Sequence, residues 1–182
     1  MSLVRTLFDI ALPVSAAVQP RTPQKVYLHL LSELGELAEE ANIAAGELYK
    51  EAGPDGVLGE AADVMNCLAD LLWITTPDKD LLEEACNEIA HLADLDDFDS
   101  NEGWPPFAFA KDDFAGATVN IHIPYGLTQE AFTLQDGHAR MILAEMTRAI
   151  LVLVKASNPL VTEREFINAY RAKCEKWREK AS

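Results

Sequence analysis

The sequence predicts an all-α protein, an antiparallel bundle of four or five helices with one irregular insertion. Two observations carry this prediction. Apolar residues recur at spacings of three and four through long segments, and stretches rich in Gly, Pro or Asp separate several of those segments. A chain of 182 residues with 49% hydrophobic content is long enough for one core and short for two, so we expect a single domain over residues 1–182.

The first predicted helix begins at Pro23 and carries one apolar seam. The seam consists of Leu30, Leu34, Leu37, Ala41, Ala44 and Leu48, and AGPDG at residues 52–56 stops it. The next helix, at about 57–75, is apolar around most of its circumference, so we expect it to be buried. Three further helices are expected at 78–95, 137–155 and 161–180.

Two segments are expected outside these helices. We interpret residues 1–22 as an N-terminal arm that packs on the domain. Their basic residue and apolar patch also fit a secretory signal, but Asp9 and Pro13 interrupt the apolar run. Residues 94–126 carry acids, Gly, Pro and six aromatic side chains, and we expect an insertion loop there. Within it, ATVNIHI alternates apolar and polar residues, which fits a short strand or hairpin.

Charge and cysteine usage exclude several classes of partner. The formal charge of −15 disfavours nucleic acid and anionic membranes, because both would be repelled. No stretch approaches the ~20 uninterrupted apolar residues that a membrane span needs. Three cysteines without a CxxC pair fit a reduced, cytoplasmic protein. An anionic ligand would bind only through a bridging cation or a local basic patch.

Carboxylates are concentrated in SELGELAEE and in the apolar helix that follows it. From Val26 to Asp78 the chain holds eleven Asp and Glu, with Lys50 as its single Lys or Arg. Glu33 and Glu36 are three residues apart and therefore project from the same side of their helix. The polar side chains of the apolar helix also form one stripe, which consists of Glu60, Asp63, Asn66 and Asp70.

These acids predict a metal site. Burying an unpaired carboxylate costs several kcal/mol or more, and a divalent cation removes that conflict. Two adjacent antiparallel helices can bring four carboxylates to one point, and we predict that these are Glu33, Glu36, Glu60 and Asp63. All-oxygen ligands suit a hard cation, so Mg²⁺ is expected, with Mn²⁺ as the alternative.

The order ExxE, loop, ExxD resembles the all-α nucleoside triphosphate pyrophosphatase superfamily, which includes MazG proteins, phosphoribosyl-ATP pyrophosphatases and dimeric dUTPases. SELGELAEE is similar to the first half of this motif and GVLGEAADVMNCLADLL to the second. FINAYRAKCEKWREK is similar to the C-terminal helix that meets the phosphates in this family, which implies substrate contacts for Lys173 and Arg178. Asp70 falls where relatives often carry a polar site residue, and we add its stripe neighbour Asn66 to the substrate-binding set. The resemblance also implies a homodimer or higher homo-oligomer.

The function implied by this resemblance is Mg²⁺-dependent cleavage of a (d)NTP to (d)NMP and pyrophosphate. The candidate catalytic residues are Glu36, Glu60 and Asp63, and Glu36 is one candidate for the base that takes the proton of the attacking water. Two alternatives use the same site, a phosphoribosyl-ATP pyrophosphatase and a non-catalytic nucleotide-binding homologue. A third is a ferritin-type di-metal bundle built on Glu88 and His91, which lacks a second ExxH motif.

Overall fold

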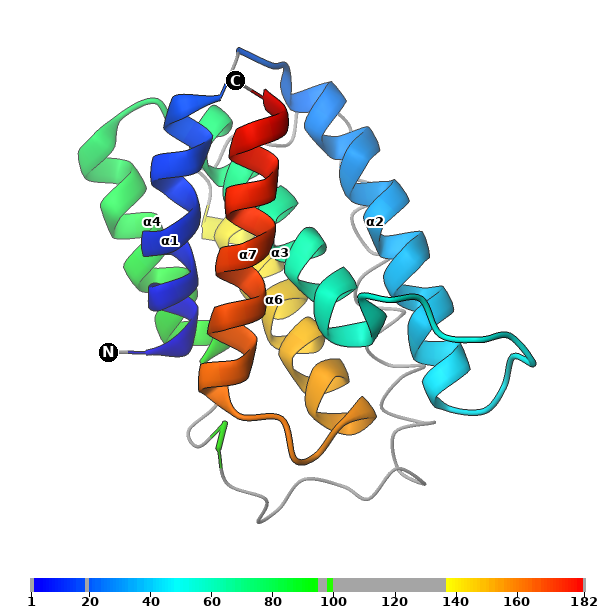
Figure 1. Ribbon diagram of the computed structural model, residues 1–182. Helices are drawn as coiled ribbons and strands as arrows, with labels where there is room; N and C mark the ends of the chain where they lie inside the picture. Colours follow the sequence, from blue (N-terminus) through cyan, green and yellow to red (C-terminus); the bar gives the residue numbers. More distant parts are fainter. Residues whose placement is uncertain (1, 19, 95–97, 100–136, 182) are drawn as a thin grey trace.

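The computed structural model describes residues 2–18, 20–94, 98–99 and 137–181. Within these ranges the chain forms only helices and no strand, which confirms the predicted all-α class (Figure 1). The helices are α1 (Leu3–Ala17), α2 (Pro23–Ala44), α3 (Gly56–Thr75), α4 (Lys79–Ala93), α6 (Gly137–Ser157) and α7 (Glu163–Ala181). The hairpin predicted within 94–126 and most of the predicted insertion lie outside the described residues. None of the described helices combines the length and apolar character that crossing a membrane requires.

Helix α3 lies at the centre of the bundle, where it contacts α1, α2, α6 and α7 (Figure 1). Its burial on nearly all sides was predicted and is confirmed. Val64, Met65, Leu68 and Leu72 are each at most 1% exposed. Burying a large aliphatic side chain of this kind contributes about 2 kcal/mol. The few polar side chains of α3 are therefore held on a helix whose position is fixed by its apolar contacts.

Helix α2 forms an outer edge of the bundle and packs mainly on α3, to which it runs antiparallel (Figure 1). The predicted seam residues Leu30, Leu34 and Leu37 are buried. The predicted continuation of the seam to Leu48 is wrong, because α2 ends at Ala44 and Leu48 is 44% exposed. Gly46, with a φ of 74°, follows the end of the helix in the left-handed conformation that glycine adopts readily.

Helix α1 lies within the segment that was predicted to be an N-terminal arm, and it is part of the core. Its residues Leu3, Leu7, Phe8 and Ala11 are buried at helical spacing. The side chain of Ser2 caps the helix by accepting a hydrogen bond from the Arg5 N–H at 3.2 Å. Helix α1 lies beside α7 and runs in the same direction (Figure 1). Together with α3 it fixes α7, the helix that carries most of the basic side chains described below.

The ends of α4 and α7 follow local capping rules. Asp78 is the N-cap of α4 and accepts hydrogen bonds from the backbone N–H groups of Asp80 and Leu81. Before α7, Thr162 and Glu165 form the reciprocal capping box. The Thr162 N–H donates to Glu165 at 2.8 Å, and the Glu165 N–H donates to the Thr162 hydroxyl at 3.2 Å. The Thr162–Glu165 capping box sets where α7 begins and hence which side chains of α7 face α3.

Candidate active site

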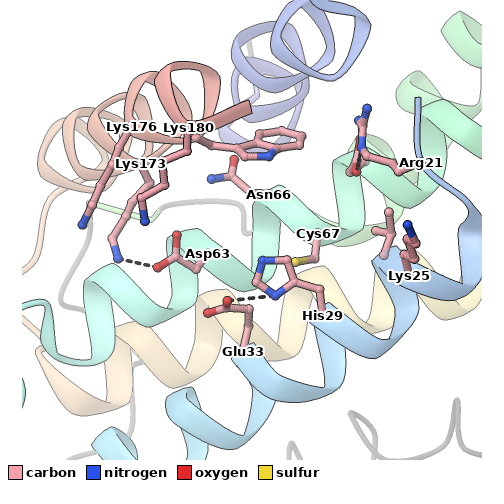
Figure 2. A pocket seen from close by; sticks show the side chains of 13 residues that line it. Arg21, Lys25, His29, Glu33, Asp63, Asn66, Cys67, Lys173, Lys176 and Lys180 are labelled. Carbon is pink, nitrogen blue, oxygen red and sulfur yellow. Dashed lines mark hydrogen bonds and ion pairs between the residues drawn. The ribbon is translucent and has the colours of Figure 1, made fainter. Parts of the chain in front are cut away.

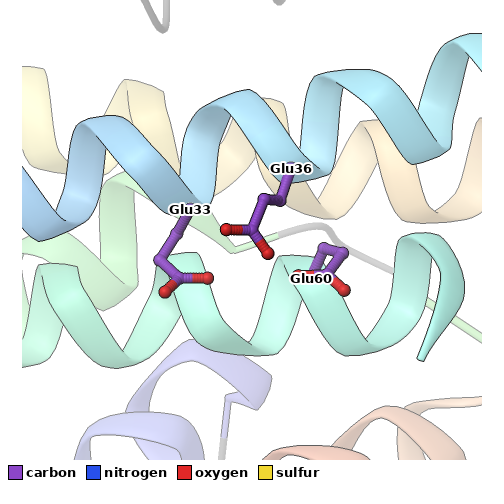
Figure 3. Close-up of side chains that lie close together, drawn as sticks. All are labelled: Glu33, Glu36 and Glu60. Carbon is purple, nitrogen blue, oxygen red and sulfur yellow. The ribbon is translucent and has the colours of Figure 1, made fainter. Parts of the chain in front are cut away.

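Three of the four predicted metal ligands come together between α2 and α3 (Figure 3). Glu33 and Glu36 lie one turn apart on α2, and Glu60 faces them from near the start of α3. Each offers a carboxylate oxygen, and these oxygens lie within 4.8 Å of one another. Glu33 and Glu60 are partly buried, whereas Glu36 is exposed. We call these three residues the acidic group.

Asp63, the fourth predicted ligand, lies one turn beyond Glu60 on α3 but outside the acidic group. Its carboxylate accepts a hydrogen bond from the ammonium group of Lys173 on α7. The predicted convergence of four carboxylates is therefore found for three of them. The physical reason is that Lys173 already supplies a positive charge to Asp63.

The carboxylates of the site oppose one another's ionisation. Burial raises the pKa of Glu60 to about 7; the charge of Lys173 counteracts this rise and the neighbouring acids add to it. Burial also raises the pKa of Glu33, and Asp63 and Glu36 act in the same direction. Removing a carboxylate from water and placing it beside like charges disfavours its charged form. The charged forms of Glu33 and Glu60 are therefore disfavoured in the acidic group.

A cleft with a cavity volume of about 300 Å³ opens between α2, α3 and α7, and Glu33 and Asp63 form part of its wall (Figure 2). Its lining includes five basic side chains, which are Arg21, Lys25, Lys173, Lys176 and Lys180. These are five of the 15 Lys and Arg residues in a chain whose formal charge is −15. Such a concentration of cations in one concave site favours an anionic ligand.

Helix α7 supplies the cations on one side of the cleft (Figure 2). Lys173, Lys176 and Lys180 follow one another at spacings of three and four, which places them on one face of the helix. Lys173 was predicted to belong to the site, whereas Lys176 and Lys180 were missed, although this spacing could have found them. Arg178 is exposed and does not line the cleft, because it projects from another side of α7. The further cations of α7 in the cleft are therefore Lys176 and Lys180, not the predicted Arg178.

Asp70, predicted to bind substrate, is engaged within the protein at one end of the cleft. It is 3% exposed and forms an ion pair with Arg21, which comes from the connection between α1 and α2. The Arg21 guanidinium also lies 5.3 Å from the centroid of the Trp177 ring. Arg21 was missed at the sequence level, because no local pattern links residues that are 49 positions apart.

Asn66, predicted to bind substrate, lines the cleft between Asp63 and Asp70 and is 7% exposed. Its Oδ1 accepts a hydrogen bond from the thiol of Cys174 at 2.9 Å. Burial raises the pKa of Cys174 to about 12, so the thiol keeps its proton near neutral pH. With its oxygen held in this way, Asn66 offers its amide nitrogen as a donor to a ligand in the cleft.

The described residues do not support the ferritin-type alternative. Glu88, one of its two proposed ligands, accepts a hydrogen bond from Arg140 at 2.7 Å. Neither Glu88 nor His91 belongs to a group of three or more closely spaced potential metal ligands in the described part of the chain. The acidic group is therefore the better candidate for a metal centre.

Comparison with protein-family models, with curated proteins and with solved structures finds no match for this chain. Its class is therefore defined by its own geometry. It is an all-α bundle in which three carboxylates from two adjacent helices stand beside a basic cleft. Any function has to be argued from this site, because a helical bundle by itself implies none.

Proposed function

We propose that this protein is a Mg²⁺-dependent nucleoside triphosphate pyrophosphohydrolase of the all-α superfamily that its ExxE and ExxD motifs resemble. The observation that carries the proposal is the position of the acidic group beside the five cations of the cleft. A triphosphate chain carries several negative charges and binds proteins through a bridging divalent cation together with basic side chains. The acidic group would bind the cation, and the basic side chains of the cleft would bind the phosphates.

The acidic group fits a hard divalent cation. Its three ligands are carboxylates with oxygens within 4.8 Å of one another, and the ion would relieve the repulsion that raises the pKa of Glu60. Glu33, Glu36 and Glu60 would hold Mg²⁺ or Mn²⁺, and Asp63 would join them on leaving Lys173. When bound, such an ion polarises a phosphoryl oxygen and lowers the pKa of a bound water.

The side chains of the cleft would bind and orient the substrate. Lys173 and Lys176 line the cleft and would bind phosphate oxygens and offset the charge that develops on the leaving pyrophosphate. The amide of Asn66 would donate a hydrogen bond to the nucleotide. Glu36 is the exposed member of the acidic group and has the solvent access that the base for an attacking water needs.

The direct test offers the purified protein a panel of NTPs and dNTPs with Mg²⁺ and measures pyrophosphate and orthophosphate separately. We expect one pyrophosphate per nucleoside monophosphate, with loss of activity in EDTA and recovery with Mg²⁺ or Mn²⁺. Phosphoribosyl-ATP belongs in the same panel as the alternative substrate. Orthophosphate as the sole product would reject the proposed cleavage position, and a protein that neither binds nor cleaves any of these nucleotides would reject the function.

A pair of variants makes this test specific to the site. Glu60→Gln removes one charge from the acidic group and should abolish Mg²⁺-dependent turnover. Glu51→Gln makes the same chemical change at an exposed residue of the connection between α2 and α3 and should retain wild-type turnover. Equal activity in the two variants would mean that turnover does not depend on the acidic group. The homo-oligomer that the resemblance implies stays a prediction, which sedimentation measurements can check.

A further inference from the structure

Lys173 is shared between two carboxylates. Its ammonium group donates to Asp63 and also lies 2.9 Å from Oδ2 of Asp55, and its side chain is only 12% exposed. Asp63 stands next to the acidic group, whereas Asp55 ends the connection between α2 and α3. A cation bound by the acidic group would compete with Lys173 for Asp63. The position of Lys173 would then depend on Asp55.

Asp55 occupies the N-cap position of α3, but its side chain makes no capping hydrogen bond. An aspartate at this position normally accepts a hydrogen bond from the first turn of the helix, which stabilises the helix. Here the carboxylate is directed at Lys173. The hydrogen bond from Lys173 is the main cause that lowers the pKa of Asp55. The Asp55 carboxylate therefore binds Lys173 instead of capping α3.

Gly59 provides the space for this contact. A Cβ atom at residue 59 would lie 2.6 Å from Cβ of Asp55 and 3.4 Å from Cε of Lys173. The first distance is too short for two carbon atoms, so any side chain at residue 59 would push Asp55 away. Glycine inside a helix is less favourable than alanine. The absence of a side chain at this buried position is what lets Asp55 and Lys173 approach each other.

We propose that Asp55 is a positioning residue for Lys173. When a divalent cation binds Asp63, Asp55 would still hold the ammonium group of Lys173 at the cleft, directed at the substrate phosphates. This inference rests on the proposed function, because it assigns Asp55 a part in the same site. Lysine has a flexible four-carbon side chain and three rotatable donors, so its position has to be fixed by a partner. Asp55 can serve as this partner because it is not one of the proposed metal ligands.

The test compares Asp55→Asn with wild type in metal and nucleotide binding. Calorimetry measures the affinity for Mn²⁺ alone and then, with Mn²⁺ present, for an α,β-imido nucleoside triphosphate that resists cleavage. Because Asp55 acts through Lys173, we expect Asp55→Asn to leave Mn²⁺ affinity within about twofold of wild type. We expect it to weaken analogue binding about tenfold, as for the loss of one charge-assisted contact. In turnover, KM should rise about tenfold and kcat should fall less than threefold.

Three further variants separate positioning from a structural role. Asp55→Glu keeps the carboxylate and should recover most of the analogue affinity, whereas Glu51→Gln should match wild type. Gly59→Ala leaves both charges in place but displaces Asp55, so it should weaken analogue binding in the same way as Asp55→Asn. Urea unfolding of each variant identifies any general loss of stability.

The outcomes distinguish the two proposals. A wild-type protein that binds no Mn²⁺ would remove the metal site and this inference together. Mn²⁺ and analogue binding without any turnover would reject the proposed activity alone, because the effect of Asp55→Asn on binding would still be measured. Wild-type analogue affinity in Asp55→Asn would overturn the inference alone. A fall in kcat with an unchanged KM would also overturn it, because Asp55 would then act on the chemical step.

Discussion

Helix α3 carries acidic side chains near both of its ends, and the protein neutralises them differently. Asp70 is 3% exposed and is ion-paired with Arg21. Glu60 is partly buried, forms no ion pair within the described residues, and has its pKa raised by burial to about 7. This rise occurs although the start of a helix favours a negative charge. The comparison teaches that α3 meets the charge of Asp70 with an internal ion pair and holds Glu60 in surroundings that disfavour its charged form.

Asp63 lies between these two ends, and among the predictions that follow from this comparison its substitution should have the largest effect. We expect Asp63→Asn to lower turnover at least about 1,000-fold, which corresponds to roughly 4 kcal/mol, because the variant lacks a candidate ligand and frees Lys173. The fold should remain intact, since Asp63 is only partly buried and the apolar contacts of α3 are unchanged. Pyrophosphate release and urea unfolding measure the two expectations. A wild-type rate would remove Asp63 from the mechanism.

Asp70→Ala should have the next largest effect, which is a loss of stability. It removes the carboxylate that pairs with the Arg21 guanidinium, and the Arg21 side chain is 17% exposed. Because Arg21 also donates to the Ser15 carbonyl and stays partly exposed, we expect a loss of about 2 kcal/mol, measured as the free energy of unfolding in urea. The matched control is the double variant Arg21→Met/Asp70→Leu, which should recover most of this loss because neither charge remains. A loss of less than about 1 kcal/mol in Asp70→Ala would mean that this end of α3 does not depend on its internal ion pair.

The smallest expected effect is a pH dependence at the other end of α3. The pKa of Glu60 is raised to about 7, so between about pH 4.5 and pH 7 the folded protein binds a proton that the unfolded chain has released. In the absence of metal, the contribution of Glu60 to stability therefore decreases as the pH rises through this range. After allowance for solvent screening of a partly exposed group, we expect a decrease of about 1 kcal/mol.

The measurement is the difference in unfolding free energy between wild type and Glu60→Gln, taken from pH 4.5 to pH 8 in EDTA. The variant should lack the part of the decrease that Glu60 causes, because glutamine does not titrate, and should keep the part that the raised pKa of Glu33 causes. Mg²⁺ should reverse the trend in the wild type, since the deprotonated carboxylates bind the ion. Parallel curves for the two proteins in EDTA would contradict the raised pKa.

Much of the fold was predictable because its signals are local. The burial of Leu34 and Leu37 follows from helical spacing alone, and Asp78 fits a local capping rule. The same spacing fails at Leu48, because Gly46 and the residues around it end the helix before the seam can continue. Helix α1 was missed for a different reason. An apolar patch at the start of the chain fits a helix, an arm or a signal equally well, and only contacts with α3, α4 and α7 decide between them.

The site was predictable to the extent that it follows from helical geometry. Glu33, Glu36 and Glu60 follow from spacing on two adjacent helices. That Asp63 lies outside the acidic group does not follow from spacing, because its partner Lys173 is 110 positions away in the sequence. The role of Asp55 was hidden as well, since its sequence context indicates only a helix cap. Which carboxylates are neutralised from within the chain is a property of tertiary packing.

The basic cleft of this acidic molecule has a consequence for the rates of ligand exchange. An anionic ligand approaching from solution meets a repulsive field from a chain of formal charge −15, and feels the attraction of the cleft cations only at short range. Dissolved ions shorten the reach of the repulsion to about 8 Å at physiological ionic strength. Added salt therefore accelerates both the arrival and the departure of the ligand. Residence time, more than affinity, is the property that ionic strength would control.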